Sequence, residues 1–397
     1  MQLVEQHVIK QADARYQAID QAAFASKNLY NAANYEIRQS FIHQGVYLCY
    51  EEMHARMKSH EPYKALPRKV SQQVLRLLHK NWVSFFKARE TWKADPSQFL
   101  GRPKLPKYKD KQQGRNILVY TIQAMSKPAI AHGKIVPSGL PITIETRCVS
   151  VDQVRIVPRQ GYYVVEVVYE QAEQQADVDP ALYAGIDIGI DNLATLTSNK
   201  VGFVPQIVNG RPLKSINQYY NKRKADLQSI LKDTRFTARM ERLTTRRTRR
   251  IDHYLHTASR RIIDLLIAQG IGTLVIGKNP HWKQEVNLGK RTNQQFVCIP
   301  HTRLIDMLCY KARLVGIAVM ITEESYTSKC SFLDMEPIGK HEQYQGKRVK
   351  RGLFRASTDQ LINADVNGSY NIVRKVAPAA FGQGSRGCVV HPARLAV

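Results

Sequence analysis

Apolar positions follow a helical spacing in the first quarter of the chain. Across residues 12–94, apolar side chains recur every three or four positions, which predicts helices with one buried face. Residues 1–10 and 116–175 instead contain short runs of β-branched and aromatic residues, broken in the longer segment by Gly and Pro, which predict the strands of a small β-barrel. The helical pattern is clearest in 68–93, where the apolar face comprises Val70, Val74, Leu78, Trp82, Phe85 and Phe86.

After a polar, acidic linker at 171–180, strand-like runs alternate with helical patterns. Such alternation favours a mixed α/β sheet. Residues 377–397, which contain several glycines and no clear period, are expected to be mostly unstructured. Strands are predicted near 183–190, 193–197, 202–208, 273–279 and 317–322, and helices at 214–261 and 302–314.

The composition points to a polyanionic partner. The chain of 397 residues carries 59 Lys and Arg against 33 Asp and Glu, a formal net charge of +26. This excess is larger than solubility requires and favours nucleic acid. A membrane is disfavoured because no apolar run is long enough to span one. Six scattered cysteines, and an N-terminus without the features of a secretory leader, predict a reduced intracellular compartment.

Two aspartates stand at positions where a charged carboxylate is energetically unfavourable. Asp187 interrupts the apolar strand at 183–190, and burial of a carboxylate is unfavourable unless it is paired or holds a metal. Gly185 and Gly189 flank it on the same face and leave room for a ligand. Asp365 begins a helix-like run far downstream. For the strand taken alone, a hydrogen-bonded polar residue at the strand end is an equally open interpretation.

Taken together, these segments resemble a known family. Gly-Ile-Asp-Ile-Gly-Ile at 185–190 and Asn-Ala-Asp-Val-Asn-Gly at 363–368 resemble the first and third catalytic segments of RuvC-type nucleases with an RNase H fold. With Tyr-Thr-Ser-Lys-Cys-Ser at 326–331 between them, the ordered set resembles TnpB, the transposon-encoded RNA-guided nucleases related to type V CRISPR effectors. The resemblance extends over nearly the whole chain.

The resemblance implies a multi-domain α+β fold with three main parts and two partners, a guide RNA and double-stranded target DNA. It also implies cleavage beside a short transposon-associated motif, in the cytoplasm of a prokaryote and at the nucleoid when the protein is on DNA. The implied parts are a helical recognition lobe at 12–112, a β-barrel wedge domain at 1–11 and 113–178, an RNase H-like (RuvC) α/β nuclease domain at 179–326 and 361–376, a basic insert at 327–360 in place of a zinc ribbon, and a flexible tail at 377–397.

The catalytic segments imply a site that binds two Mg²⁺ ions, or Mn²⁺ as a substitute, through three carboxylates. Asp187 and Asp365 match two of these positions, but the third, at the end of the fourth strand, is Gly277. Neighbouring strands lie ~4.8 Å apart, so a glutamate that follows the fifth strand can reach the vacated position. The candidates, in order of preference, are Glu324, Glu323 and Glu285.

Two other functions compete with this interpretation. Without a third carboxylate, the chain would be a nuclease-inactive, RNA-guided DNA-binding protein that acts like a repressor. Both aspartates stand at costly positions, which favours an active nuclease. An autonomous transposase is disfavoured because no helix-turn-helix pattern for end recognition stands out.

Three basic segments contain candidate nucleic-acid contacts. Lys69 and Gln73 lie one helical turn apart, and Gln reads adenine edges while Lys holds phosphate or guanine. A solvated helix face is the alternative. Lys107 lies in 102–115, where basic residues surround a tyrosine between prolines, and we expect it to contact RNA backbone. The arginines expected to face a guide–target heteroduplex are Arg246, Arg247, Arg249 and Arg250.

A zinc ribbon often separates the second and third catalytic segments of related nucleases. Here that interval contains only Cys330, together with His341, whereas structural zinc requires four nitrogen or sulfur ligands. We therefore expect no zinc. The basic, Gly-containing insert is expected to be a hairpin-like loop that touches the target strand or acts as a lid, with a disordered loop as the alternative.

Overall fold

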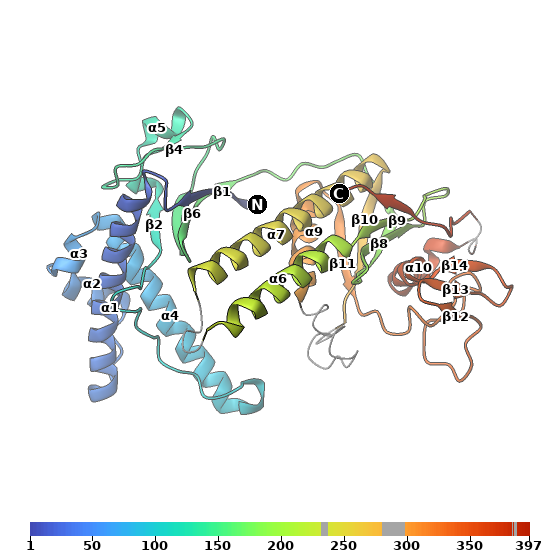
Figure 1. Ribbon diagram of the computed structural model, residues 1–397, viewed down its shortest axis with the longest axis horizontal. Coiled ribbons are helices and arrows are strands. Elements are labelled where there is room, and N and C mark those ends of the chain that lie inside the picture. Colours follow the sequence, from blue (N-terminus) through green and yellow to red (C-terminus); the bar gives the residue numbers. More distant parts are fainter. Residues whose placement is uncertain (232–236, 280–297, 383, 385–386) are drawn as a thin grey trace. The chain divides into compact units, whose positions relative to one another are not determined.

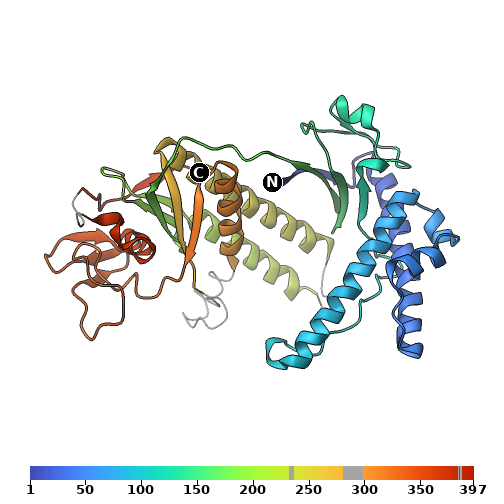
Figure 2. The same cartoon turned by 180° about the vertical axis from the view of Figure 1, so that it is seen from behind.

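The computed structural model describes residues 1–231, 237–279, 298–382, 384 and 387–397. The chain folds into two compact units, Met1–Gln171 and Ala172–Val397 (Figures 1 and 2). Helices dominate the first part of unit 1, and a mixed sheet covered by helices forms unit 2. This confirms the multi-domain α+β fold class. No helix among the described residues is long and apolar enough to cross a membrane.

The helical part of unit 1 confirms the predicted lobe. The apolar face predicted for 68–93 is buried as expected, with Val70, Leu78 and Trp82 almost inaccessible to solvent. The Trp82 indole N–H donates to Asn34 Oδ1 at 3.0 Å, so its polar edge is satisfied inside the core. The elements are α1 (Tyr16–Gln44), α2 (Tyr50–Met57), α3 (Glu61–Lys64) and α4 (Arg68–Ala94), followed by the short turn η1 (Pro96–Gln98).

An antiparallel sheet completes unit 1, and the first residues of the chain belong to it. Its order is β1-β6-β5-β2, with β1 and β2 as the edges, so these strands form an open sheet and not the closed barrel we expected. The physical reason is that α1 and α4 share one apolar core with the sheet, which leaves no face that closure would bury. The sheet comprises β1 (Gln2–Lys10), β2 (Leu118–Thr121), β5 (Gln153–Arg159) and β6 (Tyr162–Glu170); the remaining elements are η2 (Ile122–Ala124), α5 (Lys127–Ala131), β3 (Lys134–Ile135) and β4 (Ile144–Glu145).

Unit 2 is built on a six-stranded mixed sheet of order β11-β10-β7-β8-β9-β15. The central strand β7 is parallel to β10 and antiparallel to β8, and β10 is parallel to β11. The strands are β7 (Asp179–Asp187), β8 (Asn192–Ser198), β9 (Gln206–Asn209), β10 (Ile271–Gly277), β11 (Ala318–Thr322) and β15 (Ala393–Leu395). The helices are α6 (Arg211–Ser229), α7 (Ala238–Ala268), α9 (His301–Leu314) and α10 (Ala364–Val376).

The alternation of side chains along β7 assigns each face of the sheet to different helices. Ala184 and Ile186 belong to the core that includes the apolar stripes of α7 and α9. Gly185 points the other way, where a Cβ atom would lie 2.4 Å from the Ser369 carbonyl oxygen of α10. A residue without a side chain is therefore required for α10 to pack this closely. Figures 1 and 2 show α10 on one side of the sheet and α7 and α9 on the other.

The insert and the C-terminal residues fold against α10. The insert contains β12 (Lys347–Lys350) and β13 (Leu353–Arg355), and β13 pairs with β14 (Leu361–Asn363) just after it, so this part of the chain forms an antiparallel sheet and not a disordered loop. The tail that we expected to be flexible contains η3 (Pro378–Phe381) and the sheet strand β15. That expectation is corrected because apolar residues anchor the tail: Phe381 is buried in the α10 core, and Cys388 and Val390 pack against it.

Candidate functional site

Asp187 ends β7 on the face covered by α10. Its strand neighbour in β8 is Thr195, and the parallel pairing of Ile186 with Ile276 brings the ends of β7 and β10 together. A Cβ atom on Gly368 would lie 3.0 Å from Asp187 Oδ2. The carboxylate is therefore directed at the first turns of α10, and the glycine there leaves room for it.

Asp365 lies in the first turn of α10, where the helix dipole favours a negative charge. The Asn363 side chain caps the helix by accepting from the backbone N–H groups of Asp365 and Val366 at 3.0 and 3.2 Å. Asp365 Oδ2 accepts a hydrogen bond of 2.6 Å from Asn192 Nδ2, and Arg348 approaches Oδ1 to 3.7 Å. The carboxylate is thus held by one amide and one guanidinium.

Glu324 lies two residues beyond β11 and reaches the position that Gly277 leaves vacant. A Cβ atom on Gly277 would lie only 2.8 Å from Glu324 Oε2. Asn279 fixes the glutamate from both ends, because its Nδ2 donates to Oε1 at 3.1 Å and its Oδ1 accepts from the Glu324 backbone N–H at 3.0 Å. The side chain therefore crosses from the end of β11 to the end of β10.

The other candidate glutamates lie elsewhere. Glu323 is exposed and forms an ion pair with Lys375 at 3.1 Å, and a hydrogen bond from Ser325 together with that lysine lowers its pKa. It therefore points away from Asp187. Glu285 lies outside the described residues.

The pKa values of Asp187 and Glu324 are both raised. Burial raises the pKa of Asp187 well above its ordinary value, and the charges of Asp365 and Glu324 raise it further, while Arg348 opposes them. Burial also raises the pKa of Glu324 to about 7, with a smaller contribution from Glu323. A cluster of this kind is relieved either by protonation or by a bound cation.

Hard divalent cations fit this donor set, because all three residues offer carboxylate oxygens. In the part of the chain that the structure describes, however, no three His, Cys, Asp or Glu side chains are arranged to hold a metal ion. Asp365 is turned toward Asn192 and Arg348, and Glu324 toward Asn279. The backbone brings the carboxylates to one region, and rotation of side chains would still be needed to surround an ion.

The two residues expected to read a duplex motif differ in their surroundings. Lys69 is exposed on the first turn of α4. Gln73 lines a hollow of about 580 Å³ between α2, α4 and the sheet of unit 1, which also contains Arg76, Lys80 and Arg155. The hollow is basic and concave, and it holds only Gln73 of the predicted pair.

The predicted arginines of α7 divide into two groups. Arg246 and Arg250 are exposed and line a hollow of about 240 Å³ against Tyr219 and Tyr220 of α6. Arg249 is also exposed. Arg247 also lines this hollow but is half-buried: Nε donates to Asn217 Oδ1 at 2.6 Å, and Nη2 donates to the Cys298 carbonyl at 3.0 Å. Its guanidinium joins α6 to α7 and is not exposed like those of the other three arginines.

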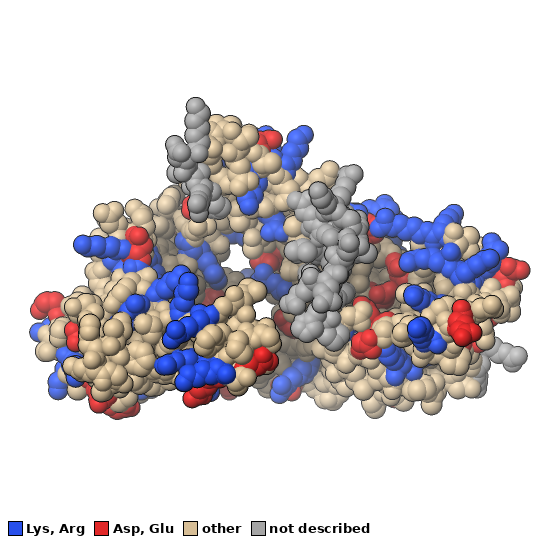
Figure 3. Space-filling view, turned by 90° about the horizontal axis from the view of Figure 1, so that it is seen from below, with Lys and Arg blue, Asp and Glu red and all other residues tan. Residues whose placement is uncertain are grey.

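Basic side chains are distributed over both units on the face drawn in Figure 3, with acidic residues between them. Lys107 is exposed on the segment that runs along α1. Asn192, Asn279 and Arg348 contact the acidic cluster and were not identified as site residues from the sequence. Only Asn279 carried a usable signal, because it follows directly on a strand that ends at the expected metal position.

Two parts of the chain match known protein families. Residues 166–283 match the family OrfB_IS605, described as a probable transposase, and residues 301–372 match the Cas12f1-like TNB domain. A curated relative, the TnpB-like protein ORF457 of Acidianus two-tailed virus, is 25% identical over 393 residues, which cover 88% of this chain and 81% of the relative. The chain is similar to TnpB-like proteins. The two matched regions together contain all three carboxylates, Asp187 in the first region and Glu324 and Asp365 in the second.

A solved structure shares the fold of this chain. A chain in the cryo-EM structure of a Cas12f1–sgRNA–target DNA complex superposes with a TM-score of 0.54 at 13% identity, covering 90% of this chain and 83% of that chain. At this identity the likeness concerns the fold alone. It nevertheless extends across both units of the TnpB-like chain, from the helical lobe to the mixed sheet.

Proposed function

We propose that this TnpB-like protein is an RNA-guided, metal-dependent DNA endonuclease whose catalytic carboxylates are Asp187, Glu324 and Asp365. The observation that carries the proposal is the position of Glu324, whose Oε2 lies where a side chain at Gly277 would begin. A glutamate from the neighbouring strand thereby restores the acidic group that the end of β10 lacks.

Each carboxylate has a distinct environment that suits it to hold a divalent cation. Asp187 is rigidly placed at the end of a central strand, while Asp365 and Glu324 are oriented by the amides of Asn192 and Asn279. Bound Mg²⁺, or Mn²⁺ in its place, supplies the activation of water and the stabilisation of the leaving 3′ oxygen in phosphodiester hydrolysis. Arg348 would balance the negative charge of Asp365 and offer a cation to a nearby phosphate.

The proposed partners are a guide RNA and double-stranded target DNA. The structure with the shared fold is described as a complex with sgRNA and target DNA, and this chain carries a net charge of +26. Arg246, Arg249 and Arg250 are placed to contact a heteroduplex backbone, and the basic hollow beside Gln73 suits recognition of a short transposon-associated motif. Sequence choice would then lie in base pairing with the guide.

The test is a plasmid-cleavage assay with the full-length protein, its co-purified RNA and Mg²⁺. Asp187→Asn and Glu324→Gln should each abolish cleavage while RNA still co-purifies, because each change removes one negative charge at almost constant volume. Glu323→Gln is the matched control and should cut like the wild type, since that side chain pairs with Lys375. Cleavage lost in Glu323→Gln and kept in Glu324→Gln would refute the assignment.

The same assay separates the alternative function. A wild-type protein that binds its guided target in a gel-shift experiment but never cuts it, with either Mg²⁺ or Mn²⁺, would be an RNA-guided DNA-binding protein. The observation that favours this alternative is that Glu324 and Asp365 are already engaged by asparagine side chains. Sequencing the co-purified RNA would identify the guide in either case.

A further inference from the structure

The segment 102–115, here called the strap, is clamped along α1 by its main chain. Four side chains on one face of α1 make the contacts. The Lys27 ammonium donates to the Lys111 carbonyl at 2.7 Å, and Asn31 bonds to both the N–H and the carbonyl of Lys109 at 2.8 and 2.9 Å. Asn34 and Arg38 both donate to the Pro106 carbonyl, at 3.0 and 3.1 Å.

The spacing of these contacts makes the strap an extended chain antiparallel to the helix. The clamping residues follow one another at three- or four-residue intervals, which places them in a row. From Lys27 to Arg38 the helix rises about 16 Å. The five residue-to-residue steps from 106 to 111 span about 17 Å when extended. The two lengths match, so the strap is held straight over this distance.

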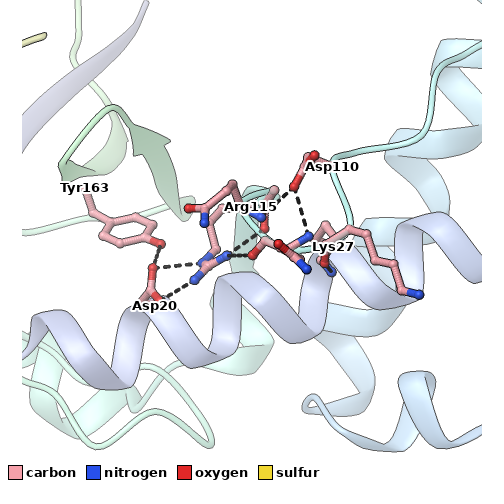
Figure 4. Close-up of polar contacts among 9 residues, drawn as sticks. Asp20, Lys27, Asp110, Arg115 and Tyr163 are labelled. Atoms are coloured by element: carbon pink, nitrogen blue, oxygen red, sulfur yellow. Dashed lines mark hydrogen bonds and ion pairs between the residues drawn. The ribbon is translucent and has the colours of Figure 1, made fainter. Parts of the chain in front are cut away.

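The end of the strap is fixed equally firmly (Figure 4). Arg115 forms a two-point ion pair with Asp20, through Nε at 2.9 Å and Nη2 at 2.7 Å, and the Tyr163 hydroxyl donates to the same carboxylate at 2.6 Å. The Asp110 side chain accepts from the backbone N–H groups of Gln112 and Gln113, which closes a turn before this anchor. The conformation is therefore set in the protein alone.

The burial of the Lys27 ammonium group in this clamp is unfavourable by itself. Its side chain is 2% exposed, and burial lowers the pKa of the ammonium group, with the charge of Arg115 as the next cause. The ammonium lies 3.7 Å from the centre of the Phe24 ring, and that contact and the Lys111 carbonyl compensate for lost hydration. A buried lysine whose ammonium donates to the main chain of the strap serves to position it.

Because the main chain faces α1, the strap's own lysines face solvent. Lys104, Lys107 and Lys109 are exposed, and Tyr108 between them is 43% exposed. A hollow lies on each side of the strap, one of about 530 Å³ and one of about 600 Å³, and Lys104, Lys107 and Phe85 line both. Among the described residues that line them, neither hollow contains an acid. Arg38, Arg89 and Arg102 add charge to the larger one.

We propose that the strap is a binding site for single-stranded nucleic acid, with the sugar-phosphate backbone along Lys104 and Lys107 and unpaired bases in the two hollows. Lysines suit phosphates, and Phe85 and Tyr108 offer rings on which bases of any sequence stack. The volumes of the hollows lie in the range of small-ligand sites. The proposal rests on the proposed function only for the source of the strand, which is a guide RNA or an unwound target DNA.

The test uses the full-length chain stripped of nucleic acid at high salt and a twelve-nucleotide single strand that contains one 2-aminopurine, made once as RNA and once as DNA. Tyr108→Ala should weaken binding by about five- to a hundredfold and relieve the fluorescence quenching that stacking causes. Tyr108→Phe should restore both. Lys107→Gln should lower the slope of log affinity against log salt by about 0.7 for each phosphate contact it removes.

Lys127→Gln is the matched control, because Lys127 is an exposed lysine of the same unit on α5, away from the strap. It should leave stacking and affinity unchanged. Loss confined to the RNA strand identifies the guide as the natural ligand, and loss confined to the DNA strand identifies the target. Unchanged binding of both strands in Tyr108→Ala, or an equal loss for a duplex of the same length, overturns the proposal. Because nothing is cut in this assay, its result is independent of the nuclease assignment.

Discussion

The substitution Gly277→Ala probes whether Glu324 works through the space above Gly277. A Cβ atom there would lie 2.8 Å from Glu324 Oε2 and 2.7 Å from Ile372 Cδ1. Both distances are well below normal van der Waals contact. The carboxylate is the free end of a flexible side chain and moves at small cost, whereas Ile372 is fully buried in α10 and must shift within a packed core.

The expected loss of stability is about 1–2 kcal/mol, at the lower end of the range for added methyl groups in cores. For a unit of this size such a loss lowers Tm by roughly 2–8 °C. Cleavage should fall much further, on the order of tenfold to a hundredfold, because a displaced carboxylate no longer lies beside Asp187. The disproportion between a small loss of stability and a large loss of activity is the signature to measure.

The assay is plasmid cleavage by Gly277→Ala, read together with thermal unfolding. Glu324→Gln sets the level of no cleavage, and Gly277→Ala should fall between that level and the wild type. Gly339→Ala is the control, because nothing lies within 4 Å of a Cβ there and its φ is not positive. Wild-type cleavage by Gly277→Ala, together with the expected drop in Tm, would refute the reasoning.

Three further predictions concern the clamp on α1 and the arginines of α7. In Asp20→Asn the free energy of unfolding should fall by about 1–2 kcal/mol at pH 7, after allowance for partial exposure. Because Arg115 lowers the pKa of Asp20, the difference in stability between wild type and variant should vanish as the pH falls through that pKa, below about 4. Urea titrations at several pH values measure this difference. Lys27→Met should speed tryptic cleavage in the strap, measured by peptide mass, without a comparable change in Tm, because the strap loses its contact with the helix. Arg247→Ala should lower Tm through the lost contacts to Asn217 and Cys298, whereas Arg250→Ala should leave Tm unchanged and weaken heteroduplex binding in gel shifts.

Local pattern was sufficient for these elements. The spacing of apolar residues predicted α4 and α9, and the branched runs predicted β7, β10 and β11, because burial of one face imposes a period that the chain shows directly. Asp187 and Asp365 stood out as acids inside an apolar strand and at a helix start, but only the family resemblance joined them into one candidate site. Even the reach of Glu324 to Gly277 followed from strand spacing.

Other features depended on which residues meet across the fold. The strands of unit 1 form an open sheet because helices α1 and α4 share its core, and the described part of the tail is structured because the α10 core takes up Phe381. Arg246 and Arg247 are adjacent and alike in the sequence, yet one is exposed and the other joins two helices. Hydrophobic periodicity specifies which face of an element is buried, but the partner of each polar group depends on contacts between residues far apart in the chain, and those exist only once the units have packed.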